Sequence, residues 1–396
     1  MVYAGSSYVN WWILNDVQCK VVAILTTRHT CAVKVCRAPR TFIILVYHNI
    51  MSGITQLISV GAQDAFITGD PQVSFFKSIY KRHTNFSIFH KTNIFQGYPR
   101  AGGMSTIRFE RLGDLLNYTY LTVSLNGNTQ EVSDWTQVVD QVELLIGGQV
   151  IDTQTSEFCE EIAIDTLANT AAKSFPASLH GGLGSDSYFY PLRFFFCENW
   201  FSSIPLVALQ YHDVELRIRW AAGFNNSYKC TAHSCYVMMD EDERKMIATQ
   251  PQEMLITQVQ KITPSNDKIQ QLDFNHPVKF IASSNAVTQN SLVSDTNKVK
   301  LVANGVDLTE SAVSIPFYTA VPSYYHTDYS SSNAENIFLY SFGLNTNKHQ
   351  PSGTLNFSRL DSFQIHCDEP VNKNIYAVNY NVLRIQNGMA GLTYAN

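Results

Sequence analysis

From residue 86 onward the chain consists of short runs of alternating apolar and polar residues separated by turn residues, and this pattern limits its fold more than any other feature. Val214–Trp220 is the clearest run, with apolar residues on one face and charged residues on the other. A period of two is typical of a strand with one buried face. Many short strands with frequent turns favour sandwiches or barrels. We therefore expect an all-β protein.

Two pairs of turn residues mark sharp reversals of the chain. Asn126-Gly127 follows the run 118–125, and Gly147-Gly148 separates the runs 142–146 and 149–152. These dipeptides supply the positive φ angles that two-residue hairpin loops require. We expect a tight turn at the first pair and a β-hairpin at the second.

The remaining strand-like runs fall into two blocks. The polar segment Glu241–Met254 separates them and is expected to be a hinge, and one helix is expected at Cys159–Ala172. Two blocks of about eight strands each would form two consecutive jelly rolls, here assigned to residues 86–250 and 251–396. The further runs that support this division are 87–95, 106–109, 256–260, 278–282, 298–302, 336–342, 362–367 and 376–385.

The composition agrees with β structure. Aromatic residues make up 12% of the chain, and charged residues make up only 15%, below the usual share of about 25%. Aromatic side chains suit a pleated, half-buried surface, whereas coiled coils and disordered chains need many more charges. No apolar run approaches the length of about 18 residues that spans a bilayer as a helix.

The first fifty residues differ from the rest. Residues 1–50 have a net charge of +4, and residues 51–396 have a net charge of −9 from 23 basic and 32 acidic residues. No regular period persists in 1–50, and the order of residue types is not that of a signal peptide. A basic arm that contacts nucleic acid is one interpretation. We favour a non-native or disordered extension, with translation starting at Met51.

Residues 51–85 are expected to form an N-terminal arm with a short helix. Asp70 is a suitable N-cap, and Pro71 suits the first helical position because its missing N–H has no partner there. Phe76 and Tyr80 would then lie on one apolar face, and basic residues would follow near the helix end.

No catalytic or cofactor-binding motif is present. The nucleophile elbow, the phosphate-binding loop, the dinucleotide fingerprint and His-Glu-x-x-His are all missing from the sequence. Asp361 and His366 could be a base and its orienting group, but a lone histidine in a strand is more often structural. The acidic run Asp240–Glu243 lacks the spacing of a calcium loop. We predict no catalytic residue and no cofactor.

Cys230, His233 and Cys235 have the spacing of half a zinc site, but no second pair lies nearby in the sequence. We therefore expect buried thiols and no metal site. All eight cysteines are scattered, which favours free thiols in a reducing compartment. Glycosylation sequons occur at Asn85, Asn117, Asn225 and Asn356, but they carry little weight without a secretory signal.

Several segments, taken in order, resemble the major capsid proteins of nucleocytoplasmic large DNA viruses, most nearly the mimivirus and chlorella-virus type. The resemblance covers roughly residues 54–396, and residues 1–50 have no counterpart in it. The segments are Gly61–Phe86, Val142–Asp152, Ile204–Val214, Asp273–Lys279, Ser352–Arg359, Tyr376–Ile385 and Gly388–Leu392.

This resemblance implies two consecutive jelly rolls in a structural protein without enzymatic activity. It implies homotrimeric, pseudo-hexameric capsomers that assemble into an icosahedral shell over an internal membrane. The implied partners are neighbouring capsomers and minor capsid proteins, with the inner viral membrane nearby and no direct contact with nucleic acid. The implied location is the virion, after synthesis in the host cytoplasm.

Three alternatives remain open at this stage. The chain is compact for the mimivirus branch, which would suit a minor capsid paralogue. Carbohydrate-binding or receptor-binding proteins also use jelly rolls, and an exposed aromatic platform would favour that function. A glycan hydrolase would need two carboxylates about 5–10 Å apart in a groove.

Overall fold

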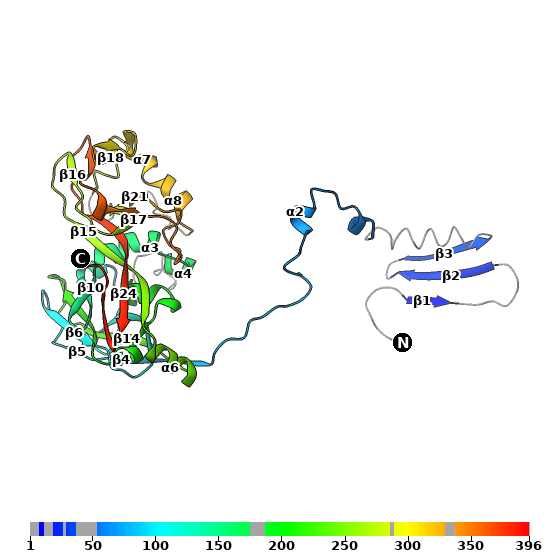
Figure 1. Ribbon diagram of the computed structural model, residues 1–396, viewed down its shortest axis with the longest axis horizontal. Helices are drawn as coiled ribbons and strands as arrows, with labels where there is room; N and C mark the ends of the chain where they lie inside the picture. Colours follow the sequence, from blue (N-terminus) through cyan, green and yellow to red (C-terminus); the bar gives the residue numbers. More distant parts are fainter. Residues whose placement is uncertain are drawn as a thin grey trace. The chain divides into compact units, whose positions relative to one another are not determined.

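The computed structural model describes residues 54–174, 187–285, 289–328 and 337–395, and the backbone of three strands nearer the amino terminus. The chain divides into two units, Met1–Arg82 and His83–Asn396. Among the described residues no helix is long and apolar enough to cross a membrane. The part of the second unit that the structure describes is built mainly of β-sheets, as expected (Figure 1).

The first unit contains a small antiparallel sheet that the sequence analysis did not predict. Its strands are β1 (Tyr8–Trp11), β2 (Cys19–Thr26) and β3 (His29–Cys36), in that order. The expectation that residues 1–50 are a non-native or disordered extension stays a prediction.

The arm contains a short helix, α2 (Ala65–Thr68), but the helix expected to begin at Asp70 does not form. Asp70 has a φ of 47°, which is not the extended conformation of an N-cap, and residues 71–82 contain no helix. A helix of this length is marginal by itself, because nucleation is costly and only packing repays it. The apolar side chains of this segment are exposed, so no packing stabilises it.

The first jelly roll consists of two antiparallel sheets. One has the order β10-β9-β13-β6-β5 and the other the order β11-β7-β14-β4, with β8 and β12 also paired to β7. The strands are β4 (Phe86–Asn93), β5 (Phe95–Gln96), β6 (Met104–Arg108), β7 (Leu115–Leu125), β8 (Asn128–Thr129), β9 (Val139–Ile146), β10 (Gln149–Thr155), β11 (Phe189–Pro191), β12 (Ile204–Pro205), β13 (Val214–Trp220) and β14 (Lys229–Met239).

Both predicted turns are present. Asn126 and Gly127 have φ angles of 53° and 86°, and Gly147 and Gly148 have φ angles of 59° and 81°. The helical segment expected near Cys159–Ala172 is also present. It comprises a π-helical turn (Phe158–Ile162), α3 (Ala163–Thr166) and α4 (Ala171–Ser174), and a further short helix, α5 (Phe195–Glu198), follows.

The segment expected to be a hinge is ordered. Residues 241–249 form helix α6 (Glu241–Thr249), and the Asp240 side chain accepts a hydrogen bond from the Glu241 N–H at its start. Arg244 Nε donates to Asp114 Oδ1 at 2.8 Å, which attaches the helix to the first jelly roll. The second jelly roll begins directly after α6.

The second jelly roll also has two sheets. Their orders are β15-β24-β17-β21, with β22 and β25 attached, and β16-β23-β18-β19, with β20 attached. The elements are β15 (Gln252–Ile262), β16 (Ile269–Gln271), β17 (Pro277–Ser284), β18 (Lys298–Ala303), β19 (Val306–Asp307), β20 (Ala312–Val313), α7 (Ser314–Phe317), α8 (Ala320–His326), β21 (Ile337–Ser341), β22 (Leu355–Asn356), β23 (Phe363–Cys367), β24 (Ile375–Gln386) and β25 (Met389–Leu392).

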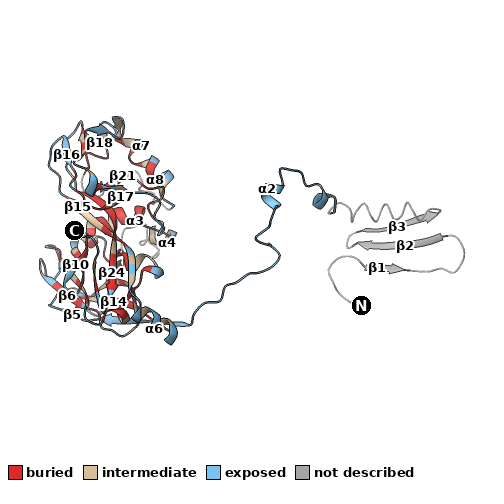
Figure 2. Cartoon of the chain, viewed as in Figure 1, coloured by how far each residue is buried: buried red, intermediate tan, exposed pale blue. Residues whose placement is uncertain are grey.

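The adjacent strands β17 and β24 of one sheet are buried on both faces along most of their length (Figure 2). On β24, Tyr376 and Val378 pack into the core of the first jelly roll. Ile375 and Ala377, which alternate with them, pack into the core of the second. Because successive side chains of a strand point to opposite faces, one sheet serves two cores. The two jelly rolls therefore form one body.

Polar groups also join the jelly rolls, and Asp152 on β10 is the most buried carboxylate among them. One oxygen accepts hydrogen bonds from the Val259 N–H of β15 at 2.8 Å and from the Thr153 N–H at 2.9 Å. The other accepts from Gln154 Nε2 at 2.8 Å. Burial raises the pKa of Asp152 to about 6, although these three donors oppose the shift.

This raised pKa predicts a pH dependence that Asp152→Asn should remove. The unfolded carboxyl has a pKa near 3.8, so the folded protein binds the proton more tightly. The contribution of Asp152 to the free energy of unfolding is fully present below about pH 3.8. It is lost as the pH rises through about 6. Relative to the variant, the wild type should lose up to about 3 kcal/mol of unfolding free energy over this window. Urea unfolding between pH 3.5 and 7 measures the difference, and a difference independent of pH would contradict the assignment.

Candidate functional site

The half zinc site suggested by the sequence does not assemble. Cys230 and Cys235 are buried on β14, and burial raises the pKa of the Cys230 thiol to about 12, so it stays protonated. His233 instead shares hydrogen bonds with the hydroxyls of Thr92 and Thr122 at 3.3 and 3.2 Å. Within the described parts of the chain, no three His, Cys, Asp or Glu side chains are grouped to hold a metal ion.

The other residues weighed for chemistry have structural partners. His366 on β23 shares a hydrogen bond with Gln364 Oε1 at 2.9 Å, and the Asp361 N–H donates to Asn304 Oδ1. The acidic run at Asp240 forms the exposed first turn of α6. Within the described residues, no hydrogen bond or ion pair joins the Asp361 carboxylate to His366.

The four sequons differ in exposure. Asn117 is buried on β7, and its Nδ2 donates to Ser203 Oγ at 2.6 Å, so the folded protein cannot carry a glycan there. Asn85, Asn225 and Asn356 are exposed.

Sheet β11-β7-β14-β4 carries a cluster of aromatic and histidine side chains, which we call the aromatic stripe. Tyr118 meets the Trp200 ring edge-on at 5.8 Å, and His90 Nε2 shares a hydrogen bond with Tyr118 OH at 2.8 Å. Tyr120 stacks on His233 at 5.1 Å. The stripe consists of His90, Tyr118, Tyr120, Phe189, Trp200 and His233.

The aromatic stripe has the character of a contact surface. Trp200 is 52% exposed, and the neighbouring Phe201 is 82% exposed. Partial burial lowers the pKa of His233, and repulsion from His90 adds to this effect, which favours uncharged imidazole. A neutral, aromatic surface is typical of the centre of a protein interface. Alternate aromatic residues in the run 118–125 were the available sequence signal, and the sequence analysis missed it.

The arm is the second apolar surface. Phe66, Phe75 and Phe76 are each more than nine-tenths exposed, and α2 has no buried residue. Single exposed apolar residues are ordinary, but a contiguous apolar stretch marks a site of interaction. The arm therefore has the character of an interaction site.

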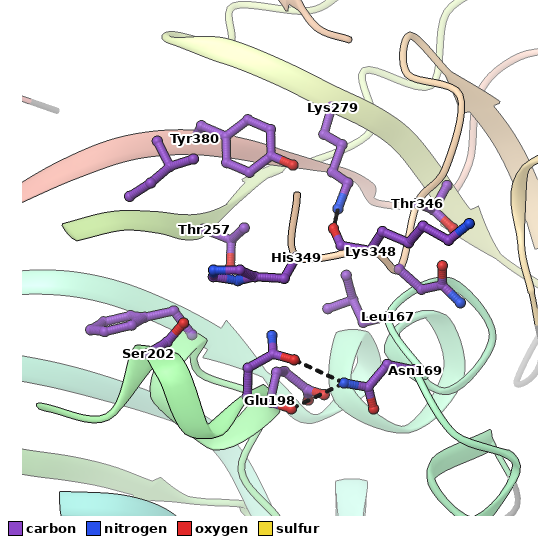
Figure 3. Close-up of a pocket in the computed structure, with 14 residues that line it drawn as sticks. Leu167, Asn169, Glu198, Ser202, Thr257, Lys279, Thr346, Lys348, His349 and Tyr380 are labelled. Carbon is purple, nitrogen blue, oxygen red and sulfur yellow. Dashed lines mark hydrogen bonds between the residues drawn. The ribbon is translucent and has the colours of Figure 1, made fainter. Parts of the chain in front are cut away.

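A small cavity of about 50 Å³ lies where the two jelly rolls meet (Figure 3). The first jelly roll supplies Asn169 and Glu198 to its wall, and the second supplies Lys279, Asn347 and Tyr380. Among the described residues that line the cavity, Glu198 is the only carboxylate, so they do not supply the pair of acids that glycan hydrolysis needs.

Lys279 is the most unusual ionisable group in this wall. Only 3% of the residue is exposed, and its Nζ donates to the backbone oxygen of Lys348 at 3.3 Å. Burial lowers the pKa of Lys279 to about 8. A lone lysine within the apolar run 278–282 was the signal for this site, and the sequence analysis read that run only as a strand.

Sequence comparisons identify the family. The profile described as "Major capsid protein N-terminus" matches residues 74–270, and "Large eukaryotic DNA virus major capsid protein" matches residues 243–391. The major capsid protein of Pyramimonas orientalis virus is 32% identical, and the alignment covers 87% of this chain and 99% of that protein. The chain belongs to this family of viral major capsid proteins. The major capsid protein of Paramecium bursaria Chlorella virus 1 is 30% identical over the same shares of the two chains.

Solved structures agree with the family assignment. A quasi-atomic model of the PBCV-1 virus capsid matches with a TM-score of 0.68 and 26% identity, covering 82% of this chain and all of that chain. The Faustovirus major capsid protein matches with a TM-score of 0.62 at 10% identity, which shows the fold alone. The expected resemblance and the double jelly roll are confirmed. As a member of this family, the capsid protein is a structural component of the virion and not an enzyme.

Replacing the buried Lys279 should stabilise the capsid protein in a buffer that contains no small anion able to pair with the lysine. In a buffer whose anion is gluconate, Lys279→Met should raise the free energy of unfolding at pH 7 by up to about 3 kcal/mol, because it removes a desolvated charge. Between about pH 8 and about pH 10.5, Lys279 keeps its proton only in the unfolded chain. The free energy of unfolding of the wild type should therefore rise over this range until it has made up the difference from the variant.

Chemical denaturation at several pH values measures both effects. Lys298→Met, at an exposed position of β18, is the matched control and should change stability by less than about 0.5 kcal/mol. A loss of stability in Lys279→Met at pH 7 would show that the charge is already compensated within the chain.

Proposed function

We propose that the capsid protein self-assembles as homotrimeric, pseudo-hexameric capsomers that tile the icosahedral shell of a large DNA virus. The shared core of the two jelly rolls carries this proposal, because it makes each subunit a single body with two similar lobes. Three such subunits around a threefold axis present six similar lobes. A closed ring of this kind needs one heterologous contact repeated three times.

The aromatic stripe is the surface we assign to the contact between subunits. Large aromatic side chains dominate the binding energy of interfaces, and charged side chains are depleted at their centres. Trp200 and the neighbouring Phe201 are both exposed to solvent. The same surface could serve a carbohydrate-binding protein, and the experiment below distinguishes the two functions.

The arm is assigned to contacts beneath the capsomer, with neighbouring capsomers, minor capsid proteins or the inner membrane. Its apolar side chains suit such surfaces better than they suit water. Residues 51–396 have a net charge of −9, which opposes binding to a polyanion, so we propose no direct contact with nucleic acid.

Trp200→Ala tests the aromatic stripe. Light scattering of the wild type should give a mass about three times 44.6 kDa. The variant trimer should dissociate into single subunits at protein concentrations at least about tenfold higher than those at which the wild-type trimer dissociates. Tyr394→Ala, which also truncates an exposed aromatic side chain, is the control and should remain trimeric. If Trp200→Ala leaves the trimer unchanged but abolishes glycan binding, the result would support the carbohydrate-binding function.

Deletion of residues 51–85 tests the arm. The truncated protein should form trimers of normal thermal stability but should not assemble into shells, because the contacts beneath the capsomer are missing. Deletion of residues 1–50 is the matched control, and it should leave both trimers and shells intact. Normal shells from the first deletion, seen by electron microscopy, would contradict the assigned role.

A further inference from the structure

Lys279 is a buried charge without a counter-ion among its described neighbours. Its Nζ has one backbone acceptor and lies 5.6 Å from the centre of the Tyr380 ring. An ammonium group has three protons to donate, and a desolvated charge is costly unless it is paired. The one carboxylate in the cavity wall, Glu198, is engaged by Lys173 at 3.0 Å and Arg193 at 3.4 Å.

The backbone directs this lysine to the junction of the jelly rolls. The register between β17 and β24 shifts between Val278 and Phe280, so Lys279 is the extra residue of a β-bulge. A bulge changes the direction of a side chain and is typical of functional positions. In Figure 3, Lys279 and Tyr380 lie on one side of the cavity, and Asn169 and Glu198 lie on the other.

The cavity wall holds polar atoms that lack hydrogen-bond partners. Tyr380 OH, Asn169 Oδ1 and Asn347 Oδ1 are buried and unsatisfied, and all three belong to residues of this wall. Such groups are rare in folded proteins and usually indicate an unseen water or ion. The tyrosine hydroxyl can donate to an anion, and the two amide oxygens can accept from the water molecules that accompany it.

The size of the cavity limits the ligand. A water molecule needs about 10–15 Å³ of such space, so about 50 Å³ holds a small ion with a few waters but no organic metabolite. The positive charge of Lys279 selects an anion over a cation.

We propose that this cavity binds a small inorganic anion, of the size of chloride or nitrate, which pairs with Lys279 and fastens the two jelly rolls together. The anion supplies the missing counter-charge between the walls. The inference is independent of shell assembly, since each folded subunit contains the whole site.

Bromide is the probe for the site, because its anomalous scattering identifies it among waters. Crystals of the full chain grown in sodium bromide should show an anomalous peak beside Lys279 Nζ. The peak should be absent from crystals grown in sodium gluconate. A cavity that holds only waters in bromide, or bromide bound only at the outer surface, would overturn the proposal.

Thermal unfolding tests the same site in solution. At constant ionic strength, replacing gluconate by bromide should raise the melting temperature of the wild type by several degrees, and the rise should saturate. Lys279→Met should lose this rise, and the control Lys298→Met should keep it. An equal rise in Lys279→Met would overturn the proposal, whether or not the capsid protein forms trimers.

Discussion

The architecture depends on two adjacent strands of one sheet that are buried on both faces. Strands β17 and β24 send alternate side chains into two hydrophobic cores, so neither jelly roll can complete its packing without the other. Two of the features described above lie within this body. The aromatic stripe lies on a sheet of the first jelly roll, and the cavity lies where the two meet. The hydrogen bond from the Val259 N–H to Asp152 crosses the same junction.

The sequence predicted most of the strands of five or more residues, because each of these has one clear local signal. Val214–Trp220 has the predicted bounds of β13, and the predicted run 376–385 lies within β24. The sequence analysis did not predict strand β14, because it considered Cys230, His233 and Cys235 only for their metal-ligand spacing and not for strand periodicity. The helix expected from Asp70 was wrong for the opposite reason. Its local signals were good, but it had no surface to pack against, and packing decides the fate of a short helix.

The functional surfaces were harder to predict, because they depend on residues far apart in the sequence. The aromatic stripe brings together His90, Tyr118 and Trp200, which lie on three separate segments of the chain, and the alternate aromatic residues in the run 118–125 indicate only part of it. The family resemblance, in contrast, could be identified from collinear segments along the chain. It implied the double jelly roll and the viral shell, but it did not indicate which side chains form contacts. Lys279 shows the limit most clearly, since its lack of a counter-ion is visible only in three dimensions.

The exposed arm has a consequence for the fate of newly made subunits. An apolar segment with Phe66, Phe75 and Phe76 open to water favours indiscriminate association before the correct partners are found. Because association of this kind rises steeply with concentration, orderly growth of a particle requires that free subunits stay scarce or that the segment be covered until it is used. The exposed arm therefore limits how quickly free subunits can accumulate.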